Sequence, residues 1–159
     1  MFAAKFRLLA CIAAIVFMAP SSAHAQAATA TRLIDYINAA RVQNGLRALP
    51  ENIRLTQAAR THARDMAENG FVDHKGSDDS NLQDRVTRTG YAWTLVAENV
   101  AAGQKTVQEV VQGWMKSPGH RKNILNEEVR ELGAGHVSNP NVGVGKNYTH
   151  FWVVVFGRR

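Results

Sequence analysis

The segment 148–156 near the end of the chain is the sequence feature that most constrains the fold. A strand covered on one face alternates apolar with polar residues, whereas bulky residues at all positions indicate a strand covered on both faces. Here one set of alternating positions holds Thr149, Phe151, Val153 and Val155, and the other holds Tyr148, His150, Trp152, Val154 and Phe156. The segment is therefore predicted to be a central strand, with 129–137 as its partner in a sheet.

Upstream of this sheet the apolar residues recur at helical spacing. We predict helices after a cap at Thr31, over 55–69 with a stop at Gly70, over 82–89, and over 107–116. Ser80 or Asn81 is expected to cap the third helix, and Thr106 with Glu109 forms the pattern of a capping box for the fourth. Helices precede and separate the strands without regular βαβ alternation, which favours an α+β fold.

The N-terminus has the pattern of a secretory signal peptide. Lys5 and Arg7 precede an apolar run over 8–19, and Ala23-His24-Ala25 matches a small-residue cleavage site. The apolar run is short for the roughly 20 residues that a membrane span needs. We therefore expect cleavage after Ala25 and no stable membrane span afterwards, with the mature protein secreted or periplasmic.

This interpretation divides the chain into three parts. Residues 1–25 form the signal peptide, 26–31 a short lead-in that we expect to be mobile, and 32–157 a single folded domain. Cys11 is the chain's one cysteine and leaves with the signal peptide. The mature protein then has no thiol, which excludes disulfides, cysteine nucleophiles and thiol redox chemistry.

The chain is basic, with a formal net charge of +6. Cleavage leaves 17 basic against 13 acidic residues, a net charge of +4. A basic surface favours anionic partners such as cell-wall polymers, lipopolysaccharide or phospholipid headgroups. The basic residues are scattered, however, and no nucleic-acid motif with interleaved aromatic residues is present, so nucleic acid is not an expected partner.

Three short stretches carry residues that can bind a metal or transfer protons. His120 follows a Ser117-Pro118-Gly119 break, in which Ser can cap a helix and Pro suits the first helical turn. His74 lies in the loop after the second helix, and Glu98 lies in an otherwise apolar run where a buried carboxylate would need a partner. Imidazole and carboxylate groups that converge can hold a cation or act in acid–base chemistry.

Other histidines and acids are given structural roles. His62 lies on the apolar stripe of the second helix, so we interpret it as a core histidine. His136 and His150 are interpreted as sheet-surface residues and not as ligands. Asp78 and Asp79 lack the repeated oxygen ligands of a calcium loop, so a solvated or capping role is expected for them.

Several ordered motifs resemble those of the CAP superfamily, which comprises cysteine-rich secretory proteins, antigen 5 and class 1 pathogenesis-related proteins. They are Phe71-Val-Asp-His74, Gly90-Tyr91, Ala97-Glu98-Asn99-Val100-Ala101, Trp114 to Leu125, and Leu132-Gly-Ala-Gly135. The resemblance extends over 32–157 and is to the bacterial, cysteine-poor SCP-domain branch. It implies a three-layer α-β-α sandwich with a central, largely antiparallel sheet.

The resemblance also implies a central cleft lined by two His and two acidic residues. Carried over to this chain, three of these positions are His74, Glu98 and His120, and the pair of imidazoles would bind a divalent cation, with zinc as the candidate. The fourth position does not carry over, because Ser117 stands where the second Glu is found. Two imidazoles and water form an incomplete zinc site, so we expect weak binding, whether Glu98 ligates the metal or orients an imidazole.

Three functional classes follow from this resemblance. The favoured hypothesis is a non-enzymatic extracytoplasmic module whose cleft binds a ligand or partner, such as a cell-envelope polymer, a lipid or a protein. The second is a peptidase-like hydrolase, in which His74 or His120 acts as base and Ser117 or bound water as nucleophile, with Glu98 as a further candidate residue. The third is binding of lipid or sterol. The sequence contains neither a G-x-S-x-G nor an H-E-x-x-H motif, and this counts against the hydrolase.

Overall fold

The computed structural model describes residues 22–139 and 148–159, which form five helices and three strands. In chain order these are α1 (Ser22–Gln43), α2 (Ile53–Asn69), α3 (Leu82–Arg88), β1 (Leu95–Ala102), α4 (Val107–Lys116), α5 (Pro118–Ile124), β2 (Glu131–Ser138) and β3 (His150–Arg158). None of the helices in these ranges is both long and apolar enough to cross a bilayer.

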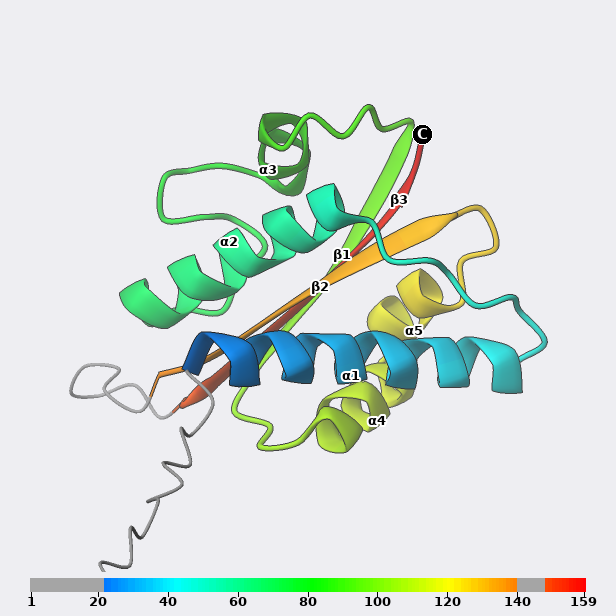
Figure 1. Cartoon of the computed structure of the whole chain (residues 1–159), viewed down its shortest axis with the longest axis horizontal. Helices are drawn as coiled ribbons and strands as arrows, with labels where there is room; N and C mark the ends of the chain where they lie inside the picture. The colour runs from blue at the N-terminus through cyan, green and yellow to red at the C-terminus, as the bar shows by residue number, and fades with distance from the viewer. Residues whose placement is uncertain (1–21, 140–147) are drawn as a thin grey trace, which may run out of the picture.

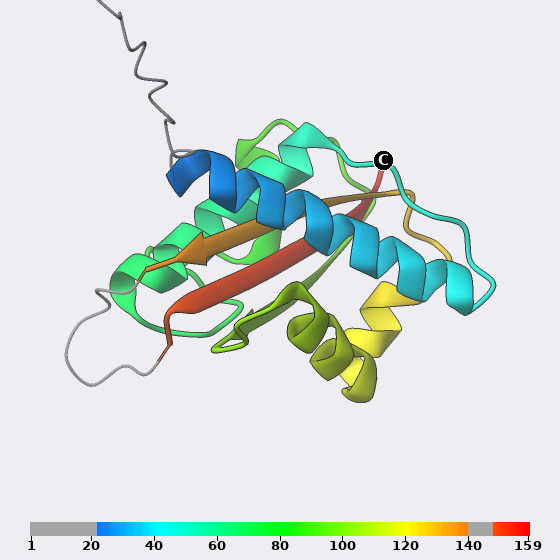
Figure 2. The same cartoon turned by 60° about the horizontal axis from the view of Figure 1, so that its bottom comes forward.

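The elements form three layers around one sheet. The described strands pair antiparallel in the order β1-β3-β2. Helices α2 and α3 cover one face, while α1, α4 and α5 cover the other (Figures 1 and 2). The predicted α+β class and the α-β-α sandwich with a central antiparallel sheet are both confirmed.

The central position of β3 explains its apolar residues on both faces. Phe151, Val153 and Val155 pack with α2 in one hydrophobic cluster, whereas Trp152, Val154 and Phe156 belong to the cluster beneath α1 and α4. All six residues are at most 1% exposed. The prediction of a doubly covered central strand is therefore confirmed, and this strand joins the two halves of the core.

The helix ends follow the local sequence signals in three cases. Gly70 adopts φ 63° at the end of α2, a left-handed conformation that glycine accepts without strain. Asn81 caps α3, and Thr106 with Glu109 forms the predicted capping box of α4. Gly70 and Asn81 thus fix where the loop that carries His74 begins and ends.

The start of the first helix was predicted incorrectly. We expected a lead-in over 26–31 and a cap at Thr31, but α1 begins at Ser22. Thr31 Oγ1 donates to Ala27 O one turn back, at 3.2 Å, so Thr31 lies inside the helix. The preceding segment is rich in alanine, the strongest helix former, and this favours extension of the helix. Residues 1–21 of the predicted signal peptide lie outside the described residues.

Two glycines let β2 approach the backbone of α2. A Cβ atom at Gly133 would lie 2.0 Å from Thr56 N, and one at Gly135 would lie 2.5 Å from the carbonyl of Ala59. Real Cβ atoms essentially never come so close to backbone. The Gly-Ala-Gly motif therefore sets how closely α2 packs on the sheet.

Side chains from α4 and α5 cover the outer edge of β1. Trp114 Nε1 donates to Val100 O at 3.3 Å, and Asn123 Nδ2 donates to Glu98 O at 3.0 Å. An edge strand otherwise presents unpaired carbonyls that can pair with another chain. These two bonds satisfy two carbonyls at the edge of β1 and attach the helices to it.

His136 is more buried than we predicted for a sheet-surface residue. It is 7% exposed, its ring lies 4.1 Å from that of Trp152, and its Nε2 hydrogen-bonds to His150 Nδ1 at 3.1 Å. Burial, together with the nearby His150, lowers the pKa of His136 to about 4. The ring is therefore neutral in the folded protein at neutral pH.

We predict that substitution of Gly133 by alanine destabilises the protein by about 3 kcal/mol or more, because overpacking against backbone allows little relaxation. Gly113→Ala is the matched control. Gly113 lies in α4, and a Cβ atom there would have nothing within 4 Å of it. Alanine at this position should stabilise the helix by up to ~1 kcal/mol. Urea unfolding of both variants measures the difference, and equal stability for the two would contradict the close approach.

We also predict a loss of stability in acid that depends on His136. Its folded pKa lies below the ordinary 6.5, so its contribution is present above pH 6.5 and is lost as the pH falls toward about 4. His136→Phe keeps a ring but removes the titration. Urea unfolding across this window should show a steeper pH dependence in the wild type, by as much as one bound proton. Identical slopes in the two proteins would refute the neutral, buried state.

Candidate functional site

The loop that carries His74 is fixed from both sides. His62 is completely buried in α2, and its Nε2 hydrogen-bonds to Asp73 O at 2.8 Å. Arg85 Nη2 in α3 donates to His74 O at 3.0 Å. The interpretation of His62 as a core histidine is confirmed, and its burial lowers its pKa. The backbone on either side of the His74 side chain is thus held by α2 and α3.

Glu98 is the buried acid of the site. Its side chain is 2% exposed and projects from β1 toward the layer of α2 and α3. Arg85 Nη2 donates to Glu98 Oε2 at 2.9 Å and to Oε1 at 3.1 Å, and the Arg85 side chain is itself 4% exposed. A buried carboxylate is stable only when paired and hydrogen-bonded, and this guanidinium supplies both.

Arg85 was not among the predicted site residues. The sequence indicated that Glu98 needs a partner but not which of the 19 basic residues supplies it. One signal was available, because Arg85 directly precedes Val86, the buried apolar residue of the short helix α3. A cation so close to the apolar face of a short amphipathic helix is a candidate for a buried ion pair.

His74 hydrogen-bonds to the same carboxylate. Its Nδ1 lies 2.9 Å from Glu98 Oε1, and an ionised carboxylate only accepts, so Nδ1 carries the proton. The bond to Glu98 raises the pKa of His74. The His74 side chain is 59% exposed. Within the described residues its other nitrogen, Nε2, has no hydrogen-bond partner, so it is available to an external ligand.

His120 lies in α5 beside a serine. Its Nδ1 is 3.0 Å from Ser117 Oγ, and its ring centroid is 6.3 Å from that of Trp114. We expected Ser117 to cap a helix, and it does occupy the N-cap position of α5. Its side chain makes no capping bond, however, because Oγ bonds His120 instead. Burial, followed by the charge of His74, lowers the pKa of His120.

Two asparagines attach the His120 segment to β1. Asn99 Nδ2 donates to His120 O at 3.1 Å. Asn123 Nδ2 donates to Asn99 Oδ1 at 2.9 Å as well as to the carbonyl of Glu98. Consecutive residues of a strand point to opposite faces, so Glu98 meets the α3 layer while Asn99 meets α5. The two histidines are therefore tied to adjacent residues of one edge strand, from opposite sides of the sheet.

The structure brings the predicted residues together as two pairs. His74 contacts Glu98, and His120 contacts Ser117. A hollow of about 540 Å³ beside His74 is also lined by Glu98 and by residues of 73–83, but not by His120. Across 22–139 and 148–159, no group of three or more His, Cys, Asp or Glu side chains is placed to hold a metal. A shared metal thus stays a prediction, with the imidazoles as its ligands.

Comparisons with known proteins agree on the family. The model of the family described as CAP, cysteine-rich secretory protein family, matches residues 34–156. The Bacillus subtilis (strain 168) protein YkwD is 36% identical over 124 residues, 78% of this chain and 47% of YkwD. The membrane protein YlbC of the same strain is 31% identical over 110 residues, 69% of this chain and 32% of YlbC. The chain thus spans less than half the length of these relatives.

Solved structures show the same fold. An extracellular protein containing an SCP domain from Bacillus anthracis str. Ames superposes with a TM-score of 0.72 at 29% identity, over 84% of this chain and 41% of that chain. An outer surface protein from Borrelia burgdorferi gives 0.69 at 23% identity, over 81% and 91% of the two chains, which shows the fold alone. Together with the motifs and the three-layer sandwich described above, these matches establish that the chain belongs to the CAP family of cysteine-rich secretory proteins, in its cysteine-poor bacterial branch.

Proposed function

We propose that this protein is a non-enzymatic extracytoplasmic binding module in which His74 and His120 hold a divalent cation weakly and help to bind a ligand or partner. The observation that carries the proposal is the state of Glu98, whose two carboxylate oxygens are both engaged by neighbours in the protein. A carboxylate in this position orients an imidazole, as the outer partners of metal-binding histidines do. The metal-facing group is then Nε2 of His74.

The ligand set accounts for the expected weakness. Catalytic zinc sites usually have three protein ligands, whereas here two imidazoles would bind the metal and water would complete its coordination. Protons compete with the cation, and Glu98 raises the pKa of His74, which strengthens this competition. We therefore expect affinity to fall as the pH is lowered through the range where His74 becomes protonated.

The contact between Ser117 and His120 favours a hydrolase as the second candidate. A hydroxyl 3.0 Å from an imidazole is the arrangement of a nucleophile and its base, and the lowered pKa keeps His120 neutral. The two functions need different tautomers of His120. A base that accepts the serine proton at Nδ1 carries its own proton on Nε2, whereas a metal ligand needs a bare Nε2 and a proton on Nδ1.

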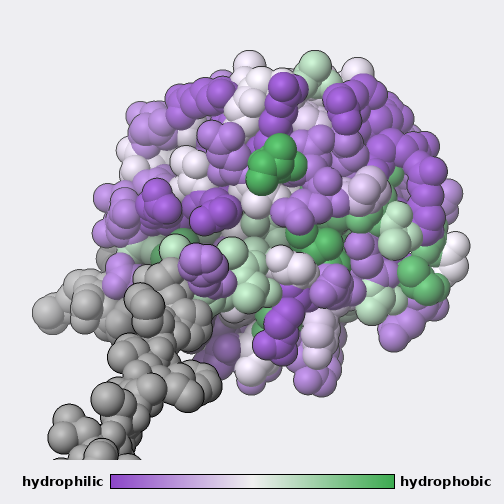
Figure 3. Space-filling view, in the orientation of Figure 1, coloured by the Kyte–Doolittle hydropathy of each residue, from purple (hydrophilic) through white to green (hydrophobic). Residues whose placement is uncertain are grey.

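Location outside the cytoplasm is part of the proposal. The signal-like pattern of the N-terminus supports it, as do the words extracellular and outer surface in the names of two structural neighbours. YlbC, by contrast, is named a membrane protein. The molecular face in Figure 3 is mainly hydrophilic, with apolar residues scattered over it, so this face gives no support to the lipid-binding alternative.

Calorimetric titration of the chelator-stripped protein with zinc at pH 8 tests the proposal. We expect saturable, weak binding near one ion per chain, lost in His74→Ala and in His120→Ala because each removes one of two ligands. Affinity should fall at pH 6, since protonated imidazole cannot bind a metal. His150→Ala is the matched control and should bind as the wild type does.

Absence of zinc binding, or binding that survives both substitutions, would refute the cation site. Peptide turnover provides the comparison with the second candidate. Turnover that is present in the wild type and disappears in Ser117→Ala would replace the binding module with the hydrolase. Ser117→Ala should leave zinc affinity within a few-fold of the wild type if the first proposal holds.

We also predict that Arg85→Leu destabilises the protein by about 3–5 kcal/mol, because it leaves Glu98 buried without its cation. Arg88→Leu is the matched control on the same helix. Arg88 forms an exposed ion pair with Asp78, at 2.7 Å, and such pairs contribute little. Urea unfolding distinguishes the two cases, and a loss in Arg85→Leu no greater than that in Arg88→Leu would contradict the role assigned to Arg85.

A further inference from the structure

Three exposed cations around α5 lack an ionic partner. Lys116 ends α4, and Arg121 and Lys122 lie on α5. None of the three forms an ion pair within the part of the chain that the structure describes, although Arg121 Nη2 donates to Asn44 Oδ1 at 3.1 Å. Their charges are therefore not neutralised by the protein itself.

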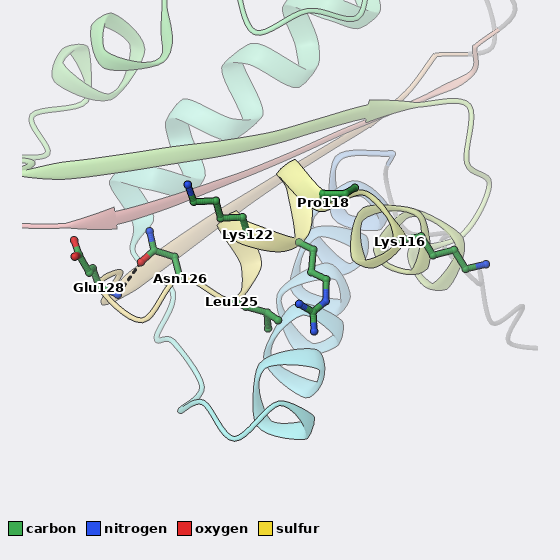
Figure 4. A pocket seen from close by; sticks show the side chains of 7 residues that line it. Lys116, Pro118, Lys122, Leu125, Asn126 and Glu128 are labelled. Atoms are coloured by element: carbon green, nitrogen blue, oxygen red, sulfur yellow. Dashed lines mark hydrogen bonds between the residues drawn. The ribbon is translucent and has the colours of Figure 1, made fainter.

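These cations line one pocket of about 730 Å³, which we call the basic pocket. Its lining residues are Lys116, Pro118, Arg121, Lys122, Leu125, Asn126 and Glu128. Figure 4 shows Lys116 at the end of α4, Lys122 on α5, and Asn126 and Glu128 in the segment that follows α5. Glu128 is the one acid of the lining, and it pairs with Arg158 at 3.5 Å. The lining is thus positively charged.

A buried arginine adds charge behind the basic pocket. Arg41 is 1% exposed, and its Nη1 donates to Ile124 O at 2.5 Å and to Asn126 O at 3.0 Å. These partners are carbonyls, and no described carboxylate forms an ion pair with Arg41. Burial, followed by repulsion from Arg47 and Arg130, lowers the pKa of Arg41. Arg47 and Arg130 therefore lie near Arg41.

The basic pocket is distinct from the histidine site. Pro118, Arg121, Lys122 and Leu125 follow the spacing of one helical face. His120 and Asn123 lie on the part of α5 that is attached to β1. Occupation of the basic pocket therefore does not require the cation proposed above, because neither His74 nor His120 lines the pocket.

We propose that the basic pocket binds phosphate groups of a soluble phosphate polymer. A guanidinium matches two phosphate oxygens at once, and two flexible ammonium groups can follow further phosphates along a chain. The volume lies within the range of ligand sites. The apolar residues of the lining are Pro118 and Leu125, and the exposed large apolar side chains of the described residues lie outside it, so the pocket presents little apolar surface to a membrane. This favours a polymer in solution over a lipid headgroup.

The test is binding of a fluorescently labelled inorganic polyphosphate chain to the full protein in the presence of chelator, followed by anisotropy. We expect saturable binding that weakens with added salt, because screening reduces attraction between exposed charges. The variant Lys116→Gln/Arg121→Gln/Lys122→Gln should bind at least about tenfold more weakly, since it loses three phosphate contacts. Its zinc titration should match the wild type, which separates this result from the cation site.

The control variant removes three charges elsewhere. Arg32, Arg60 and Arg64 are exposed and form no ion pair among the described residues. Their joint replacement by glutamine should weaken binding less than about threefold, through net charge alone. An equal loss in both variants, an unchanged pocket variant, or no binding by the wild type would overturn the proposal. Binding to phosphatidylglycerol vesicles but not to polyphosphate would overturn the assignment to a soluble polymer.

Discussion

The ion pair between Arg85 and Glu98 is the interaction on which the candidate site depends. Both side chains are at most 4% exposed, and the pair joins α3 to the edge strand β1. Removing either charge would leave the other buried and unpaired, which costs far more than an exposed pair contributes. The same guanidinium holds the backbone carbonyl of His74. One arginine therefore fixes both the acid and the loop that carries the exposed histidine.

The edge of β1 holds the segment that carries His120. Edge strands need their free carbonyls covered, and here Trp114 and Asn123 cover two of them. Asn123 belongs to α5, so the bond that covers the carbonyl of Glu98 also positions this helix. Asn99 adds a second attachment through the carbonyl of His120. The alternation of a strand then sends Glu98 and Asn99 to opposite layers, so adjacent residues of one strand organise two different histidine pairs.

The fold was largely predictable from the sequence because its signals are local. Bulky residues on both faces of 148–156 identified the central strand, and Asn81, Thr106 and Gly70 marked helix ends. The predicted start of the first helix was wrong, because the alanine-rich sequence before Thr31 is itself able to form a helix. The family resemblance implied that His74 and Glu98 line one cleft, and in the structure the two side chains contact each other. Arg85 was missed, because side-chain pairing across 13 residues has no periodic signature. Ser117 and His120 were paired only in the hydrolase hypothesis, and the structure shows a hydrogen bond between them.

If His74 and His120 hold a cation through Nε2, each ring must carry its proton on Nδ1, so the tautomers of the two rings test the proposed site. Long-range ¹H–¹⁵N correlation spectra, recorded in chelator at a pH where both rings are neutral, report which nitrogen carries each proton. We expect the proton on Nδ1 in both rings, donated to Glu98 in one and to Ser117 in the other. A proton on Nε2 of His74 would contradict the orienting role of Glu98, and one on Nε2 of His120 would favour the serine–histidine hydrolase over the cation site.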